Sequence, residues 1–337
     1  MSILEKVGVM SNQYQRLAKL CLLMVISSIL ITACSQQVVQ TTHFSSQIPS
    51  DCRVVQHVFG KTCVPLDPQR IIALDPIFTL DPLIALGVEP IGFASYNGSG
   101  EEVLLGVSFD EVEGAKNVGD AGQPSFEKIL VLKPDLILTT DYGDDEQKYK
   151  LLSKIAPTVS VPNESHLSPE DYENKPWFKE NLRFVAKVLG QEAKSEEVLR
   201  QYQNRIEALK NRLGNQLHQI EVSVIFYGEG YIWTISKGNY PVSFILDDVG
   251  LRYKSVPYGE WNLSIETISE YDSDILFIVD VDKRGASFYL QHPLFRDLEV
   301  VKNNRAYVVS QENWRSGGIS GANKTLNDLF KYLPEDE

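Results

Sequence analysis

From Gln69 onward, short apolar runs of the chain alternate with amphipathic segments. The runs "RIIALD", "EPIGFAS" and "DLILTTD" have the length and composition of buried strands. The segments "FTLDPLIALG", "SFEKILVL" and "DEQKYKLLSKIA" have the apolar spacing of short helices. This alternation predicts a parallel α/β sheet, and we assign the lobe that contains it to residues 51–176.

A long helix is expected next, within a helical linker at 177–218. The chain has no proline and no glycine from Glu192 to Leu213, and 22 helical residues would span about 33 Å. Strand and helix patterns resume in residues 219–337. The predicted fold class is therefore α/β, with two α/β lobes of mostly parallel sheets joined by one long linker helix. The apolar residues on one face of this helix are Leu199, Tyr202, Ile206, Leu209 and Leu213.

One short pattern occurs twice. The stretch "SFEKILVLKPDLILTTD" (125–141) aligns without a gap with "SIETISEYDSDILFIVD" (264–280), and five positions are identical. Each copy predicts a helix followed by a strand. The two lobes are therefore expected to share one architecture, although unrelated α/β units can produce a similar pattern by chance.

The N-terminus has the pattern of a secretory signal. Basic residues precede the apolar run "LCLLMVISSILI", which is shorter than the roughly 20 residues needed to span a membrane. The following "ITAC" resembles a bacterial lipobox, which makes residues 1–33 a lipoprotein signal peptide and Cys34 the lipidated residue. An ordinary cleaved signal is the alternative. Residues 34–50 are polar and suit a flexible tether.

Export places the chain in a compartment that permits disulfides. Cys52 and Cys63 are expected to form a disulfide that closes a short N-terminal hairpin, with a stabilisation of about 3 kcal/mol. The formal net charge is −13, which argues against nucleic acid as a partner. The expected location is the periplasmic side of the inner membrane, or another extracytoplasmic face, with only a lipid anchor in the membrane.

Several segments, in their order and spacing, resemble the class III substrate-binding proteins of bacterial ABC importers. These helical-backbone receptors bind ferric siderophores, cobalamin or haem. The ending "YVVSQENWRSGG" resembles the iron-siderophore branch most closely. The segments that carry the resemblance, besides the linker helix, are "QRIIALDPIFTLDPLIALGVEPIGF", "VGDAGQPSFEKILVLKPDLIL", "WNLSIETISEYDSDILFIV" and "NNRAYVVSQENWRSGGISGANKTLNDL".

The resemblance implies a receptor that captures a ferric siderophore, of hydroxamate or citrate type, without chemistry and without a cofactor. Its lobes would close only slightly because the linker helix is stiff. As a monomer it would then dock on an ABC permease dimer, where one glutamate on each lobe pairs with permease arginines. The matching residues are Glu127 and Glu266. Each follows a capping serine in a first helical turn, where the helix dipole alone also favours a negative charge.

The ligand site is expected between the lobes, on loops that follow strands. Two cations near these loops, Arg284 and Arg315, could hold a carboxylate. The resemblance places three aromatics, Tyr96, Trp261 and Trp314, in the cleft. Core packing is the alternative role for the aromatics, and solvent exposure for the arginines. The candidate aromatic ligands are Tyr96, Tyr142, Tyr227, Tyr231, Trp233, Trp261 and Trp314.

Other functions fit the sequence less well. Cobalamin and haem stay open as ligands, because their sites are also aromatic. A site for bare zinc or manganese would need converging histidines, and the five histidines of the chain are scattered. A lipid-anchored hydrolase lacks the G-x-S-x-G and H-E-x-x-H motifs, while a pair of glycosidase carboxylates stays open.

Overall fold

The computed structural model describes residues 51–98, 101–141, 146–163, 175–238, 240–257 and 259–335. The predicted signal peptide, Cys34 and the predicted tether all lie outside these ranges. None of the described helices is both long and apolar enough to cross a membrane.

The described chain begins with a hairpin of β1 (Cys52–His57) and β2 (Gly60–Pro65). Cys52 and Cys63 form a disulfide across the two strands, with their Cα atoms 5.5 Å apart. The inward-facing Val55 and Val64 are buried in the core beside β8 (Thr158–Val161). The disulfide and the hairpin predicted from the sequence are therefore confirmed.

The N-terminal lobe is built on a sheet with the strand order β5-β4-β3-β7-β8, and β6 pairs with β4. All of its described pairings are parallel except β4 with β5. The strands are β3 (Ile71–Ala73), β4 (Gly92–Gly98), β5 (Glu101–Val103), β6 (Lys116–Asp120) and β7 (Leu136–Thr140), together with β8. The helical segments of the lobe are η1 (Pro76–Leu80), α2 (Asp81–Ala85), η2 (Phe109–Val112), α3 (Phe126–Leu132) and α4 (Glu146–Leu152).

The C-terminal lobe has a mixed sheet with the order β12-β10-β9-β13-β14, in which β11 pairs with β9. Strand β9 pairs in parallel with β13, but β10 is antiparallel to both β9 and β12. The strands are β9 (Glu221–Gly228), β10 (Tyr231–Thr234), β11 (Arg252–Tyr253), β12 (Asn262–Leu263), β13 (Ile275–Asp280) and β14 (Ala306–Ser310). The helical segments are α8 (Pro241–Val249), η5 (Ile265–Tyr271), α9 (Ala286–Leu290), α10 (Pro293–Arg296), α11 (Glu299–Lys302), α12 (Gln311–Trp314) and α13 (Ile319–Tyr332).

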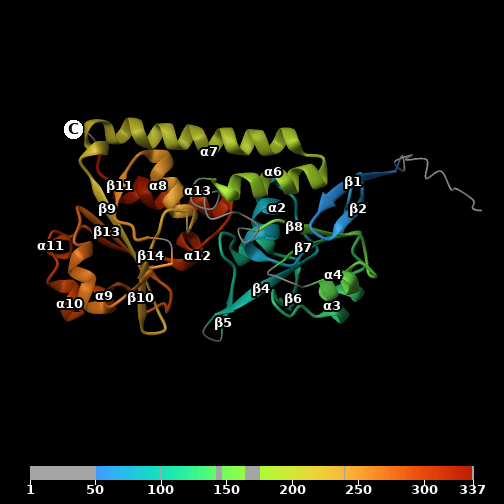
Figure 1. The fold of residues 1–337 in the computed structure, drawn as a ribbon, viewed down its shortest axis with the longest axis horizontal. Helices are drawn as coiled ribbons and strands as arrows, with labels where there is room; N and C mark the ends of the chain where they lie inside the picture. Colours follow the sequence, from blue (N-terminus) through green and yellow to red (C-terminus); the bar gives the residue numbers. More distant parts are fainter. Residues whose placement is uncertain are drawn as a thin grey trace, which may run out of the picture. The chain divides into compact units, whose positions relative to one another are not determined.

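Two helices connect the lobes. Helix α6 (Trp177–Leu189) ends at Gly190, and α7 (Glu192–Leu213) then runs along both lobes before η4 (Gly214–His218) (Figure 1). The bounds of α7 are those predicted from the absence of proline and glycine. Its predicted apolar face is also the buried one.

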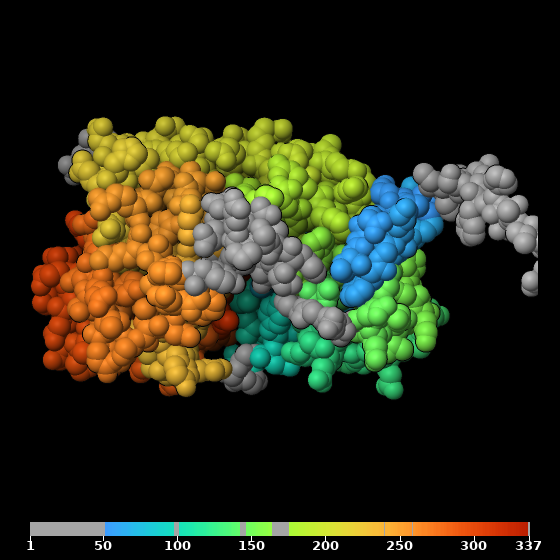
Figure 2. All heavy atoms as spheres, viewed as in Figure 1, coloured from blue at the N-terminus to red at the C-terminus, as the bar shows by residue number. Residues whose placement is uncertain are grey.

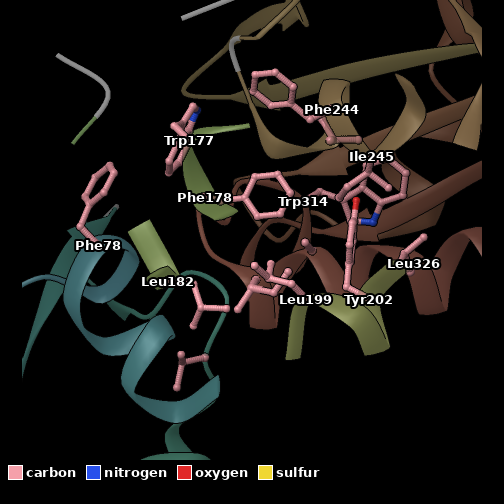
Figure 3. Packing of buried hydrophobic residues seen from close by; sticks show 14 of the residues in the cluster. Phe78, Trp177, Phe178, Leu182, Leu199, Tyr202, Phe244, Ile245, Trp314 and Leu326 are labelled. Carbon is pink, nitrogen blue, oxygen red and sulfur yellow. The ribbon is translucent and has the colours of Figure 1, made fainter. Parts of the chain in front are cut away.

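A single hydrophobic core extends through both lobes beneath these helices. Figure 3 shows side chains of η1, α6, α7, α8 and α13 packed together, with Phe78 at one end and Leu326 at the other. Phe178 of α6 contacts Tyr202 of α7 and Phe244 of α8, with ring centroids 5.9 and 6.4 Å apart. The lobes are therefore joined by shared packing as well as by the long helix.

Candidate functional site

A pocket of about 390 Å³ lies between the two lobes. Its N-terminal-lobe wall comes from η1, β4 and the chain around β5. Its C-terminal-lobe wall comes from the residue before α8 and from the segment after β14. Ligands of open α/β sheets bind at the carboxyl ends of strands, and this pocket lies beside such ends in both lobes. The lining residues are Ile77, Tyr96, Asn97, Val103, Leu105, Tyr240, Gln311 and Arg315. Figure 2 shows a hollow where the teal atoms of one lobe approach the red atoms of the other.

The tyrosine in the N-terminal-lobe wall is held by a buried carboxylate. The Tyr96 hydroxyl donates to Asp75 Oδ2 over 2.7 Å, and Asp75 is fully buried. Asp75 Oδ1 in turn accepts hydrogen bonds from the backbone N–H groups of Ile77 and Phe78, which open the π-helical turn η1. One carboxylate thus fixes both Tyr96 and Ile77 at the pocket.

Arg315 supplies the cation of the other wall. Its Nη1 donates to Gln311 Oε1 over 3.0 Å, and its guanidinium carbon lies 5.9 Å from the centre of the Trp233 ring. Gln311 is held by its own bond to the Val281 carbonyl at 2.9 Å. No carboxylate of the described residues forms an ion pair with Arg315, and its buried Nε has no hydrogen-bond partner among them. The guanidinium is therefore oriented and retains donors for a ligand.

An aromatic stack supports this arginine. Trp233 lies parallel to Phe226, with centroids 5.5 Å apart and planes 8° apart. Phe226 is fully buried and contacts Tyr240 at 4.9 Å. Tyr240 and Arg315 both line the pocket. The two stacked rings therefore connect them, since Phe226 contacts Tyr240 and Trp233 contacts Arg315.

The expected cleft position of Trp314 is wrong. Its side chain is 1% exposed, and its indole N–H donates to Asp328 over 2.8 Å. The ring packs on Phe277 at 4.5 Å within the core shown in Figure 3. Successive residues of a helical turn point in different directions, so Trp314 faces the core while Arg315 faces the pocket.

The other predicted ligand residues that the structure describes do not line this pocket. Tyr227 packs against Phe288 and Tyr289 on the far side of the β9 sheet. Tyr231 is 70% exposed at the β9–β10 turn, and Arg284 is exposed beside Asp282. Trp261 is half-buried and its carbonyl accepts from Thr234 N–H. Tyr142 lies outside the described residues.

The sequence reasoning missed several lining residues. Asn97 directly follows the predicted ligand residue Tyr96, and Gln311 lies in the segment "YVVSQENWRSGG", four residues before Arg315. Tyr240 precedes the proline that begins α8, and its contact with Phe226 is a tertiary contact. For Tyr240 and Gln311 the available signal is a position at the start of a helix, α8 and α12 respectively.

The two glutamates of the repeated pattern are both exposed. Glu127 lies in the first turn of α3, where the Ser125 hydroxyl accepts from Lys128 N–H at 3.3 Å. Glu266 lies in the first turn of η5, which is a 3₁₀ helix and not the expected α-helix. A hydrogen bond from the Ser264 hydroxyl lowers the pKa of Glu266. Both carboxylates are therefore available to a partner.

Two α/β lobes with a pocket between them, connected by a long helix, define a two-lobed solute receptor. The family model of periplasmic binding proteins matches residues 79–312, and the chain belongs to this family. Among the described residues, no three His, Cys, Asp or Glu side chains are grouped as a metal site.

Relatives in the family are similar along most of their length. The chain is 28% identical to the Fe(3+)-citrate-binding protein YfmC of Bacillus subtilis, with 96% of this chain and 99% of the relative covered. It is 29% identical to the achromobactin-binding periplasmic protein of Dickeya dadantii, with 78% and 86% covered.

Solved structures share the fold. SirA of Staphylococcus aureus, crystallised with staphyloferrin B, aligns with a TM-score of 0.63 at 24% identity, covering 84% of this chain and 99% of that chain. The iron-uptake system-binding protein FeuA of Bacillus subtilis aligns with a TM-score of 0.65 at 22% identity, covering 83% and 100%.

Proposed function

We propose that this protein is the substrate-binding component of an ABC importer and captures a ferric siderophore, of citrate or hydroxamate type, in the interlobe pocket. The observation that carries the proposal is the guanidinium of Arg315, which pairs with no carboxylate of the described residues and lies over an aromatic stack in the wall opposite Tyr96. A ferric siderophore satisfies its metal internally and presents an apolar shell with carbonyl or carboxylate oxygens. Aromatic faces and one oriented cation match that surface.

The names of relatives that bind ferric citrate and achromobactin support this ligand class. The mechanism is capture without chemistry. The Arg315 guanidinium would offer two parallel N–H donors to a carboxylate of the ligand, while Tyr96 and Tyr240 would pack on its apolar parts. We expect only slight lobe closure, since α7 and the shared core resist bending.

Delivery requires a permease, and the proposed contacts are Glu127 on one lobe and Glu266 on the other. Helix α3, which carries Glu127, lies on the side of its lobe opposite α7 in Figure 1. Lipidation at Cys34 would hold the protein, as a monomer, at the extracytoplasmic face of the membrane. There the two carboxylates would pair with permease arginines.

The test is a fluorescence titration of the mature protein with ferric citrate, a ferric hydroxamate, a ferric catecholate, haem and cobalamin. Trp233 is the tryptophan beneath Arg315, so ligand should quench its emission. In a Trp233→Phe variant we expect most of this quenching to be lost while binding, followed by calorimetry, is kept. Quenching by cobalamin or haem alone would contradict the iron proposal.

The arginine is tested with a matched control. Arg315→Ala should weaken binding of an anionic ferric complex about tenfold to hundredfold, since a hydrogen bond to a charged group contributes roughly 1.5–3 kcal/mol. Arg284→Ala removes the same charge from an exposed position outside the pocket and should leave affinity unchanged. Equal effects of the two substitutions would show a general charge effect and remove Arg315 from the site.

A further inference from the structure

A buried carboxylate crosses the boundary between the lobes. Asp81 begins α2 in the N-terminal lobe and is fully buried. Its Oδ1 accepts from Ser320 N–H over 2.9 Å and its Oδ2 accepts from Gly321 N–H over 3.0 Å. These two donors belong to the first turn of α13, so one lobe caps a 14-residue helix of the other.

The segment "RSGGISG" (315–321) is shaped to this contact. A Cβ atom added to Gly318 would collide with the Asp81 carboxylate, and one added to Gly317 would collide with Ile77 and Trp177. Gly318 has an extended backbone with φ of −117°, so close approach, and not a left-handed conformation, is what requires glycine here. The structure therefore gives this sequence motif a role at the lobe boundary.

The same contact connects the two walls of the ligand pocket. Arg315 is the first residue of the segment "RSGGISG". Ile77 lies in η1, the helical turn that ends at the residue before Asp81. A second interlobe bond, from Gly106 N–H to the Glu312 carbonyl at 2.7 Å, lies beside the lining residue Leu105. The distance between the walls is thus fixed by the two hydrogen bonds to the Asp81 carboxylate and by one backbone hydrogen bond.

We propose that Asp81 is a positioning residue for ligand binding: it clamps α13 against the N-terminal lobe and thereby sets Arg315 relative to Tyr96 and Ile77. The proposal rests on the proposed function for its effect on ligand, but the clamp itself can be measured without one. It makes Asp81 a determinant of affinity although its carboxylate does not line the pocket.

Two charged groups face this carboxylate from the packed elements. Lys324 lies in the next turn of α13, and its Nζ forms an ion pair with Glu111 Oε2 of η2 at 2.5 Å. Burial raises the pKa of Asp81 to about 6. An opened clamp would expose Asp81 to water and return its pKa towards the ordinary 3.8, so acid favours the closed clamp. Between pH 5 and pH 8 the opening equilibrium should rise about tenfold.

The experiment compares Asp81→Asn with Asp272→Asn. Asp272 accepts from the backbone N–H groups of Glu299 and Val300 at 2.8 and 2.9 Å, so it makes the same kind of helix cap within one lobe. Hydrogen exchange of residues 316–322 reports the clamp directly. Affinity for a ferric complex that the wild-type protein binds reports the pocket.

We expect Asp81→Asn to lower protection of the Ser320 and Gly321 amides, to abolish the tenfold pH effect on their opening, and to weaken binding about tenfold. Asp272→Asn should change neither the protection of residues 316–322 nor the affinity for the ferric complex. Gly318→Ala perturbs the clamp from the opposite lobe and should reproduce the losses of protection and affinity.

Wild-type protection in both Asp81→Asn and Gly318→Ala would overturn the clamp, and lost protection with unchanged affinity would overturn its positioning role. If the wild-type protein binds none of the ferric complexes, the proposed function fails and so does the claim about affinity. The exchange measurements still decide whether the clamp exists.

Discussion

Replacing Trp314 tests whether this residue stabilises the fold or contacts the ligand. The side chain is 1% exposed, packs on Phe277 with ring centroids 4.5 Å apart, and donates a hydrogen bond to Asp328 at 2.8 Å. Trp314→Phe keeps an aromatic ring but removes the donor. The expected loss in unfolding free energy is about 1–3 kcal/mol, because Asp328 keeps its desolvation cost but loses the indole donor.

The two contributions to this loss can be separated. Trp314→Ala removes the ring as well and should cost about 3–5 kcal/mol. Burial already raises the pKa of Asp328, and the bond from Trp314 opposes that shift. In Trp314→Phe the pKa of Asp328 should therefore rise further. An Asp328→Asn partner variant completes a double-mutant cycle that isolates the hydrogen bond.

The assay is denaturant unfolding of each variant beside a ligand titration. We expect the midpoint to fall while affinity for the ferric complex changes less than threefold in Trp314→Phe. A large loss of affinity with an unchanged midpoint would refute the core assignment and return Trp314 to the cleft.

Three further predictions follow from other sites. The pKa of Asp81 in the folded protein lies above its ordinary value, so the residue adds stability below pH 4 that is lost as pH rises through about 6. Between pH 4 and 7 the wild-type protein should therefore lose about 2 kcal/mol relative to Asp81→Asn, measured by denaturant unfolding at each pH. Cys52→Ser should lower stability by about 3 kcal/mol, and reduction of the wild-type protein should add 2 Da by mass spectrometry if the disulfide is present. Glu127→Ala with Glu266→Ala should abolish transport while leaving ligand affinity intact; transport at the wild-type rate would contradict the docking role.

Local patterns predicted the elements well because the information is local. Helix α7 was bounded correctly by the lack of proline and glycine, and its buried face follows from spacing alone. Contacts between residues that are far apart in the sequence leave no comparable pattern in the local sequence. The contact of Trp314 with Phe277 depends on how α12 packs on the C-terminal sheet, so Trp314 was misplaced while its neighbour Arg315 lies at the pocket.

The repeated stretch also contains an aspartate that has the same structural role in both lobes. Asp135 accepts from the N–H groups of Gln69 and Arg70 just before β3, at 2.8 and 2.9 Å. Asp274, its equivalent, accepts from Glu221 N–H at the start of β9 at 2.8 Å. Each aspartate therefore ties the strand of its copy to the neighbouring parallel strand at the same register.

This shared role explains why the aspartates recur in both lobes without any reference to a permease. The reason why the fold pattern is repeated can therefore be considered separately from the role of the two glutamates. The aspartates and apolar positions account for the repeated fold, because they act within each lobe. The glutamates have no such shared structural role: Glu127 and Glu266 are both exposed. The Ser264 hydroxyl donates a hydrogen bond to Glu266, whereas the equivalent Ser125 hydroxyl accepts one from the Lys128 N–H. A function outside the chain is therefore the better explanation for the glutamates, and the transport assay of the double variant tests that function alone.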